Sequence, residues 1–322
     1  MNQINLDKPF LTYEKLIQKL ENKKLSFTDK YDKEYTIKLL KDNGYFSLVC
    51  GYKDMFKSKK TNDYIAGVNI HDIYSLFLFD DNMRSILFKY ILIAERKIKS
   101  LYSYAFVETF DELQTTYLDT TKYDYINADA KKINGINELV QILTKLITPP
   151  FDKNYLRHQY KKHHNIPMWV VIKALSLGNV SKMYSFSTNA VKTKISKEFV
   201  LSEGELVSVF ELISKFRNIC AHNERLYDYK VKKSSYICDT SVHRVLNIKK
   251  KKNEYIQGKR DLFALLICLK FLIDNKNFEQ MIDKIDNLIE ELLNSSKKVQ
   301  RSNLLKTMGF PENWKTIKTI KI

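Results

Sequence analysis

Glycine and proline are scarce in this chain, and their scarcity limits the folds that it can adopt. Only 8 glycines and 5 prolines occur among 322 residues. A β-sandwich or barrel needs tight turns at short intervals, and those turns use glycine and proline. Hydrophobic residues make up 44% of the chain, which is enough for a substantial core. We therefore expect an all-α fold of long helices.

Apolar residues recur at three- and four-residue steps through most of the sequence, which is the period of an amphipathic helix. Local signals mark some ends: Thr12 is a candidate N-cap, Asn43-Gly44 a stop, and Asp80-Asp81-Asn82 a break within a long apolar region. The expected helices cover residues 13–20, 30–41, 70–110, 129–146, 152–163, 168–175, 179–184, 202–226, 261–274 and 278–293. Residues 229–260 have an irregular pattern, with a hairpin expected near 236–248.

No internal repeat and no linker rich in Pro, Gly or Ser divides the chain. A single domain over residues 1–322 is therefore the simplest organisation. Within it we expect four parts: an N-terminal helical extension (1–65), a helical core (66–228 and 261–300), a basic insertion (229–260) and a C-terminal tail (301–322).

The charge balance favours a polyanionic partner. The chain has 54 Lys/Arg and 37 Asp/Glu, a net charge of +17, which suits nucleic acid or an anionic membrane surface. The basic insertion holds ten of the cations, at positions 230, 232, 233, 244, 249–252, 259 and 260, against two acids. Two alternatives stay open: the lysines reflect a compositional bias of the coding genome, or the insertion is a solvated loop that keeps the protein soluble.

The cysteines and the apolar stretches indicate a reduced, soluble protein. Cys50, Cys220, Cys238 and Cys268 show neither a pairing pattern nor metal-ligand spacing with histidine, so we expect free thiols, no metal and no cofactor. The first residues lack the apolar centre of a signal peptide, and the longest apolar stretch, Leu262–Leu269, is too short to cross a membrane. We expect a cytoplasmic protein.

One short run, Phe216–Tyr227, concentrates residue types that can act on a phosphodiester. Arg217 can clamp a phosphate with its guanidinium, and His222 can move protons near neutral pH. With Asn218 orienting a phosphate oxygen or the imidazole, this set suffices for RNA cleavage by 2′-hydroxyl attack without a metal. The products would be a 2′,3′-cyclic phosphate and a 5′-hydroxyl. DNA would resist cleavage, because it lacks the 2′-hydroxyl. The plainer alternative is a half-buried histidine that caps the helix.

The spacing of this run has a consequence for assembly. On a helix that continues to Leu226, Asn218, His222 and Arg225 share one stripe. Arg217 and His222 are five residues apart, about 140° around the axis, so their side chains do not converge. An antiparallel pair of these helices from two copies would bring Arg217 of one chain near His222 of the other. We therefore expect a homodimer.

Several further segments match one protein family in order and spacing. They are Lys8–Glu14, Asn43-Gly44-Tyr45 with Gly51-Tyr52, Phe79-Asp80…Arg84 with Glu95-Arg96, Pro167–Trp169 with Ser176–Asn179, Arg217–Arg225, and Met308–Trp314. Together they resemble the Abi-like (abortive infection, Abi-2) family of HEPN-type ribonucleases. The resemblance implies an all-helical HEPN-like core, a role in antiphage defence or as a toxin, and kinship with CRISPR RNA-targeting ribonucleases. Asn223 and the basic insertion depart from the family pattern.

Two functions follow from these observations. The first is a metal-independent endoribonuclease with Arg217, Asn218 and His222 at its site. The second is an RNA-binding protein that grips phosphates without cutting and forms a stable complex with a structured non-coding RNA, as some relatives are thought to do. In either case, ten basic side chains are predicted to contact RNA: Arg96, Arg157, Lys161, Arg225, Lys232, Lys233, Lys249, Lys250, Lys251 and Lys252.

The remaining polar and aromatic candidates have simpler interpretations. Glu95 and Lys99 have the spacing of a surface ion pair on a helix, with orientation of the motif helix by Glu95 or Arg96 as the alternative. Met168 and Trp169 are predicted to be core residues, with RNA stacking by Trp169 as the alternative. His158, His163 and His164 are taken as part of a solvated basic face, against a phosphate-contacting strip.

Overall fold

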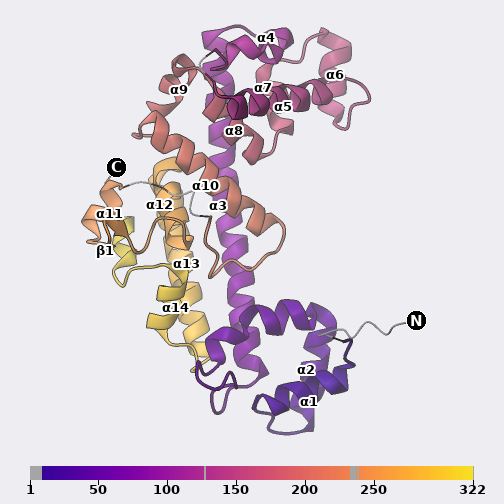
Figure 1. Ribbon diagram of the computed structural model, residues 1–322, viewed down its shortest axis with the longest axis vertical. Helices are drawn as coiled ribbons and strands as arrows, with labels where there is room; N and C mark the ends of the chain where they lie inside the picture. Colours follow the sequence, from indigo (N-terminus) through magenta and orange to yellow (C-terminus); the bar gives the residue numbers. More distant parts are fainter. Residues whose placement is uncertain (1–8, 127, 233–236, 238, 322) are drawn as a thin grey trace. The chain divides into compact units, whose positions relative to one another are not determined.

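The computed structural model describes residues 9–126, 128–232, 237 and 239–321 (Figure 1). These residues are mainly helical, and the strands among them form one short two-stranded hairpin. The prediction of an all-α fold is therefore confirmed. The chain groups into two compact units, Met1–Met83 with Ile285–Leu304 and Arg84–Lys284 with Leu305–Ile322. That the two units act together as a single domain stays a prediction.

The first unit is built from short helices and from parts of two long ones. Its complete elements are α1 (Tyr13–Asn22), α2 (Lys30–Asn43), the π-helical turn η1 (Phe46–Cys50) and the 3-10 turn η2 (Lys53–Phe56) (Figure 1). It also contains the first 14 residues of α3 (Ile70–Thr109) and the later part of α13 (Asn275–Ser295). The helix α14 (Arg301–Met308) begins in this unit.

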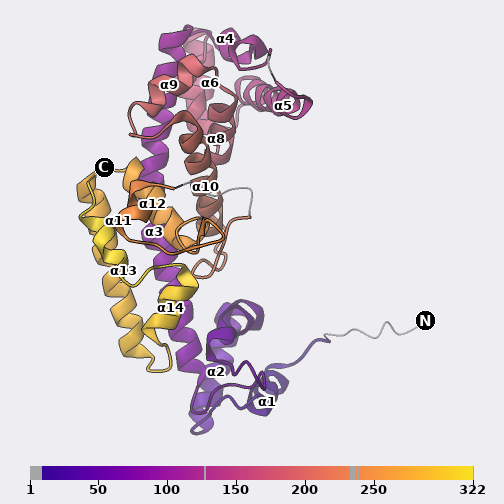
Figure 2. The same ribbon diagram turned by 60° about the vertical axis from the view of Figure 1, so that its left-hand side comes forward.

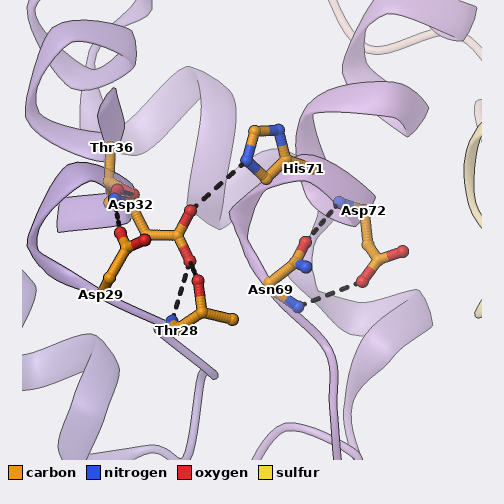
Figure 3. Close-up of polar contacts among 7 residues, drawn as sticks. All are labelled: Thr28, Asp29, Asp32, Thr36, Asn69, His71 and Asp72. Carbon is orange, nitrogen blue, oxygen red and sulfur yellow. Dashed lines mark hydrogen bonds and ion pairs between the residues drawn. The ribbon is translucent and has the colours of Figure 1, made fainter. Parts of the chain in front are cut away.

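Polar side chains at the helix starts of this unit are used for capping (Figure 3). Asp29 accepts a hydrogen bond from the Asp32 N–H at 3.0 Å, and Asp32 accepts from the Thr28 N–H and hydroxyl. Asn69 and Asp72 each accept from the backbone N–H of the other, at 3.2 and 3.1 Å, before and within the first turn of α3. Such bonds satisfy the donors that every helix start leaves open. This polar cluster therefore has a structural explanation.

The predicted break near Asp80 is wrong, because α3 runs without interruption through 40 residues. Aspartate disfavours helix interiors when its side chain competes for the local backbone. Here Asp80 is fully buried and accepts a hydrogen bond from the Tyr52 hydroxyl at 2.7 Å. Its carboxylate has a partner on another element, so the helix continues.

The second unit contains the remaining elements and the larger core (Figures 1 and 2). In chain order they are α4 (Gln114–Leu118), η3 (Thr120–Lys122), α5 (Ala130–Ile147), α6 (Asn154–His163), α7 (Met168–Val171), η4 (Ile172–Ala174), α8 (Leu177–Phe186), α9 (Asn189–Ser196), α10 (Glu203–Ala221), α11 (Ser241–Val245), β1 (Lys250–Lys251), β2 (Glu254–Tyr255), α12 (Leu262–Leu272) and η5 (Trp314–Lys318). The helix α12 is apolar apart from Lys270, and all of its residues except Phe271 are buried, as expected for a core helix.

The central helix of this unit is α10, which packs against α8, α9 and α12. Its buried face repeats apolar residues at helical steps, from Leu206 to Ile219. Phe210 anchors this face, since its ring lies 4.9 Å from the ring of Tyr184 on α8. The packing holds α10 in place, and the Arg217–His222 run forms its last turns.

Candidate functional site

The start of α10 is fixed by its own sequence. The Ser202 hydroxyl accepts a hydrogen bond from the Glu205 N–H, and the Glu205 carboxylate accepts one from the Ser202 N–H at 2.8 Å. This reciprocal capping box confirms the predicted start of the helix. With a fixed start and a buried face, the orientation of each later residue on α10 is determined.

The end of α10 differs from the prediction, which extended the helix to Leu226. The helix ends at Ala221, and His222 is its C-cap. Asn223 has a φ of 56°, the Glu224 N–H donates to the Ile219 carbonyl at 3.1 Å, and the Asn223 N–H donates to the Cys220 carbonyl. This is a Schellman motif, which needs a left-handed residue after the C-cap, and asparagine tolerates that conformation better than most residues other than glycine. Asn223 therefore has a structural role in ending the helix.

The early end of the helix changes the surroundings of two predicted site residues. His222 is exposed, and among the described residues its imidazole has no hydrogen bond or ion pair. The alternative of a half-buried capping histidine is wrong in its burial, although His222 does hold the C-cap position. Arg225 lies beyond the helix and pairs with Asp228 at 2.9 Å, so it does not share a helical stripe with Asn218 and His222.

Arg217 points toward α3. Its side chain is 28% exposed, its Nε lies 3.7 Å from Oε2 of Glu95, and its guanidinium lies 5.8 Å from the centre of the Phe88 ring. The 3.7 Å separation is an ion pair and is too long for a hydrogen bond. Both the Nε of Arg217 and the Oε2 of Glu95 are buried without a hydrogen-bond partner in the described part of the chain. Polar atoms in this condition are rare in folded proteins and call for an explanation.

Glu95 is held in place from its other side. Its Oε1 lies 2.7 Å from the Nζ of Lys99, which also donates to the Leu175 carbonyl at 2.7 Å. The predicted Glu95–Lys99 pair is therefore present, but it is largely buried rather than on the surface. The same carboxylate also contacts Arg217 on the motif helix, and the alternative that Glu95 orients this helix stays a prediction.

A groove of about 570 Å³ runs along α3 beside Glu95. Its lining is mainly apolar, with Phe88, Leu92 and Ile93 along it and Arg96 and Lys99 at one end. Arg96, which was predicted to contact RNA, is exposed and lies one residue from the carboxylate that contacts Arg217. Nearby, the buried Arg84 donates to the Glu224 carbonyl at 3.3 Å and so ties the loop after α10 to α3.

Within one chain, Arg217 and His222 are not brought together. Arg217 packs against α3, whereas His222 is exposed at the end of α10. Asn218 is also exposed and lies one turn before His222, and its carbonyl accepts a hydrogen bond from the His222 N–H at 2.9 Å. Asn218 and His222 thus face the same side of the helix end, as predicted from their spacing.

The basic insertion has a defined structure around a buried histidine. His243 on α11 is fully buried; its Nε2 lies 2.8 Å from the Gly258 carbonyl, and its ring stacks on Tyr255 at 4.5 Å. The Thr240 N–H donates to Nδ1, so the ring is neutral with its proton on Nε2. Burial lowers the pKa of His243. This role of His243 could not be read from the sequence.

The hairpin of the insertion lies later in the chain than predicted. A short helix, α11, occupies residues within the predicted hairpin region, and the strands pair at Lys250–Tyr255 and Lys251–Glu254. Lys252 and Asn253 between the strands both have positive φ angles, which is the backbone of a tight hairpin turn. In the predicted region, residues 236 and 238 are outside the described residues.

The predicted RNA contacts of the insertion cluster on this hairpin. Lys249, Lys250, Lys251 and Lys252 are all exposed, and Lys250 lies 3.4 Å from Asp239 and 4.3 Å from the centre of the Tyr255 ring. Lys232 is exposed, and Lys233 lies outside the described residues. We call residues 249–252 the lysine hairpin.

Two other predicted contacts lie on α6, which packs against α5 and α7. Arg157 and Lys161 are exposed, and Arg157 donates weakly to the Phe151 carbonyl at 3.5 Å. His158 and His163 are also exposed, with rings 6.3 Å apart, which fits the predicted solvated face. Of the two predicted core residues, Met168 is buried, but Trp169 is 50% exposed, so that prediction is wrong for Trp169.

The net charge is concentrated in the unit that carries the Arg217–His222 run. The first unit has 16 Lys/Arg and 15 Asp/Glu, so nearly all of the +17 belongs to the second. Part of that charge surrounds a cavity of about 310 Å³ lined by Lys230, Lys259 and Arg260 together with Tyr255 and Asp261. Burial raises the pKa of Asp261 to about 6. Sequence analysis placed these cations in the basic insertion but did not place them around a cavity.

No three His, Cys, Asp or Glu side chains in the described part of the chain lie close enough to hold a metal ion. No helix among the described residues is both long and apolar enough to cross a bilayer.

The chain is thus an all-α protein with its charge gathered in one unit. The sequence profile of the family described as Abi-like protein matches residues 38–228, which is more than half of the chain, and the chain belongs to this family. The family suggests a role in abortive infection. No curated protein and no solved structure matches the chain. The family match ends just before the basic insertion, which fits the departure noted in the sequence.

Proposed function

We propose that this Abi-like protein is a HEPN-type endoribonuclease of antiphage defence, acting as a toxin that cleaves RNA without a metal. The proposal is carried by the exposed imidazole of His222, which has no hydrogen bond or ion pair among the described residues and lies at the end of the helix that carries Arg217 and Asn218. A histidine with a free ring nitrogen can accept and donate protons at neutral pH. The concentration of positive charge in the same unit would draw RNA to this end of the helix.

The proposed reaction uses only groups of the chain and of the RNA. His222 takes the proton of a ribose 2′-hydroxyl, whose oxygen attacks the adjacent phosphorus. The bond from phosphorus to the 5′-oxygen breaks, and the imidazole of His222, which now carries the proton of the 2′-hydroxyl, gives that proton to the leaving oxygen. The products are a 2′,3′-cyclic phosphate and a 5′-hydroxyl. DNA has no 2′-hydroxyl, so it would bind without being cut.

Arg217 would stabilise the charge that develops on the phosphate. Its loose 3.7 Å pair with Glu95 leaves the guanidinium without a hydrogen bond from Nε in the described residues. A phosphate can offer two oxygens in the planar fork geometry of arginine, at shorter and stronger charge-assisted contacts. Glu95 would keep its contact with Lys99 when Arg217 moves to the substrate. Asn218 would orient a phosphate oxygen or the imidazole.

The proposal includes a homodimer, since Arg217 and His222 do not converge within one chain. Two copies related by a two-fold axis can place the arginine of one chain beside the histidine of the other. Each dimer would then hold two composite sites.

A second function is favoured by the lysine hairpin. Four consecutive exposed lysines on a two-stranded turn are suited to binding RNA phosphates, whether or not cleavage follows. On this alternative, the protein forms a stable complex with a structured non-coding RNA, and Arg217 and His222 grip phosphates. Purified protein would then carry nucleic acid, seen as raised absorbance at 260 nm that ribonuclease treatment removes.

Cleavage of labelled single-stranded RNA in the presence of EDTA tests the first function. We expect fragments with 2′,3′-cyclic phosphate ends, loss of cleavage in His222→Ala and Arg217→Ala, and no cleavage at a 2′-deoxy nucleotide. His71→Ala, which removes an exposed histidine of the first unit, is the matched control and should cut normally. Cleavage that survives in His222→Ala would rule out the assignment. If the wild type binds RNA without cleaving it, the second function, stable RNA binding, is supported instead.

A further inference from the structure

A second cavity on α3 has the composition of a site for an aromatic ligand. It has a volume of about 400 Å³ and is lined by Ser100, Ser103, Tyr104, Val107 and Glu108 of α3 and by Trp169 of α7. Two large rings from separate elements border it, and both are exposed: Tyr104 is 67% and Trp169 is 50% exposed. Tryptophan and tyrosine are enriched where proteins bind partners, because each combines a large apolar ring with a polar group.

The position of Trp169 follows from the packing of its neighbours. Met168, Val171 and Ile172 are buried, and together they form the inner face of the turn. Trp169 is about 100° around the axis from Met168, so its ring is directed away from the core. Burial of its neighbours therefore fixes an aromatic ring at the cavity without covering it.

Tyr104 is held by polar contacts at its outer edge. Its hydroxyl donates to Glu108 Oε1 at 3.2 Å, and the other oxygen of Glu108 lies 2.7 Å from the Nζ of Lys194 on α9. The hydrogen bonds from Lys194 and Tyr104 lower the pKa of Glu108, so this carboxylate stays ionised and keeps the arrangement at neutral pH. The ring face of Tyr104 is left for a ligand.

The cavity lies on the same helix as the contact of Arg217. Eight residues separate Arg96 from Tyr104, which places the two about 12 Å apart along α3. Among the exposed cations, Lys97 on α3 and Lys173 just after α7 are the nearest to the cavity residues in sequence. A strand of RNA whose backbone passes the Arg217–Glu95 contact would therefore have a base within reach of the cavity.

We propose that this cavity, between Tyr104 and Trp169, is a stacking subsite for one unpaired nucleobase of single-stranded RNA. The inference rests on the proposed function, because it takes RNA as the ligand, and it adds the place where a base near the cleaved bond is held. Proteins that bind single strands combine a basic surface with aromatic platforms on which bases stack. The charge of the second unit and the two rings supply both parts.

The chain offers a direct readout, because it has only two tryptophans. Trp314 is 1% exposed, so a ligand in solution can contact only Trp169. In full-length protein carrying His222→Ala, which binds without cutting, an adenine hexaribonucleotide should quench the Trp169 emission and shield it from acrylamide. Inorganic polyphosphate should displace this RNA by competing for the cations, and should not quench.

Substitutions then separate stacking from charge. Trp169→Ala should weaken hexamer binding, measured by fluorescence anisotropy of labelled RNA, roughly tenfold, which is the usual effect of losing one stacked base. Trp169→Phe should remove the emission signal and keep most of the affinity. Tyr31→Ala, which removes an exposed aromatic side chain of the first unit, is the matched control and should bind normally.

The failures of the two proposals are distinguishable. RNA binding by anisotropy with unchanged Trp169 emission, or with full affinity in Trp169→Ala, would overturn the subsite and leave the proposed function standing. Trp169 could also be shielded from acrylamide without RNA, in a protein that is dimeric by light scattering. That result would make the cavity a protein interface and overturn the subsite. Absence of any RNA binding would overturn the proposed function and the subsite together.

Discussion

On the proposed function, Arg217 has two alternative partners, the Glu95 carboxylate and a substrate phosphate. The distances indicate that the contact with Glu95 is the weaker of the two. The Nε of Arg217 lies 3.7 Å from Glu95, beyond hydrogen-bond range, whereas Glu95 makes a close 2.7 Å contact with Lys99. A phosphate that accepts two hydrogen bonds from the guanidinium gains more than Arg217 loses by leaving Glu95. On the proposed function, the Nε of Arg217, which is buried without a hydrogen-bond partner in the described residues, would gain one when the substrate phosphate binds. A role in catalysis is one explanation for a buried polar atom without a hydrogen bond.

Asp261 gives a prediction on pH dependence. Burial raises its pKa to about 6, from an ordinary value of 3.8. Between these two pH values the folded state binds the proton more tightly than the unfolded state, so the free energy of unfolding falls as the pH rises. Compared with Asp261→Asn, the wild type should lose roughly 2–3 kcal/mol of stability across this window. Urea unfolding of both proteins at several pH values measures the difference, and parallel curves would contradict the assignment.

At the scale of the helix, the predicted and the observed structure differ most at the end of α10. The starts of α1, α5, α10 and α12 were predictable, because Thr12, Asp129, Ser202 and Asp261 cap them through local hydrogen bonds. The end at Ala221 depends on one left-handed residue, Asn223, within a run that otherwise has helical periodicity. Asparagine is only a weak stop signal, so the prediction ran on to Leu226.

Other features of the site could not be read from the sequence, since they depend on which elements meet. The spacing of Glu95 and Lys99 predicted their pair, but its burial follows from the Lys99 contact with the Leu175 carbonyl. Trp169 is a large apolar residue of the kind expected in the core. Its exposure is set by the burial of Met168 and Val171 on the opposite side of the turn. Periodicity over a turn of four residues is too short to decide between the two faces.

Asn223 supports a prediction at the same scale. Asn223→Ala should destabilise the protein by about 1 kcal/mol, because a side chain with only a Cβ is strained at positive φ, whereas Asn223→Gly should be neutral or slightly stabilising. If the proposed site is correct, the alanine variant should also cleave RNA more slowly, since the loop that positions His222 loses its turn. Chemical unfolding and cleavage rates of the two variants measure both effects. Equal behaviour of Ala and Gly would argue against a role for the left-handed turn.

At the scale of the whole molecule, the charge divides between the two units far more unevenly than the sequence total of +17 suggests. A compositional bias of the genome would place lysine in both units alike, and it does occur in both, with 15 among the 103 residues of the first unit and 31 among the 219 of the second. The difference in net charge comes from the acids, which number 15 in the first unit and 22 in the larger second unit. The compositional alternative therefore accounts for the number of lysines, and the proposed electrostatic interface depends on where the lysines of the second unit lie.

The lysine hairpin gives the corresponding prediction. Replacing Lys249–Lys252 by glutamine in the His222→Ala protein should weaken RNA binding and reduce its salt dependence. Each phosphate contact with a single strand contributes about 0.7 to the slope of log affinity against log salt, so the slope should fall by at most about 3. Replacing Lys15, Lys38, Lys59 and Lys60, four exposed lysines of the first unit, is the matched control and should leave the slope unchanged. An equal fall in both variants would mean that the hairpin has no special role.

Assembly is tested by mixing two inactive proteins. In a two-fold dimer whose sites combine Arg217 of one chain with His222 of the other, a chain with Arg217→Ala and a chain with His222→Ala form a heterodimer with one intact site and one doubly defective site. Random exchange makes about half of the dimers mixed, so the activity should recover to about a quarter of the wild-type value. If each site instead used Arg217 and His222 of the same chain, every site in the mixture would lack one group and no activity would return. Light scattering on the same samples supplies the independent measurement, since recovery without a dimer would contradict the composite site.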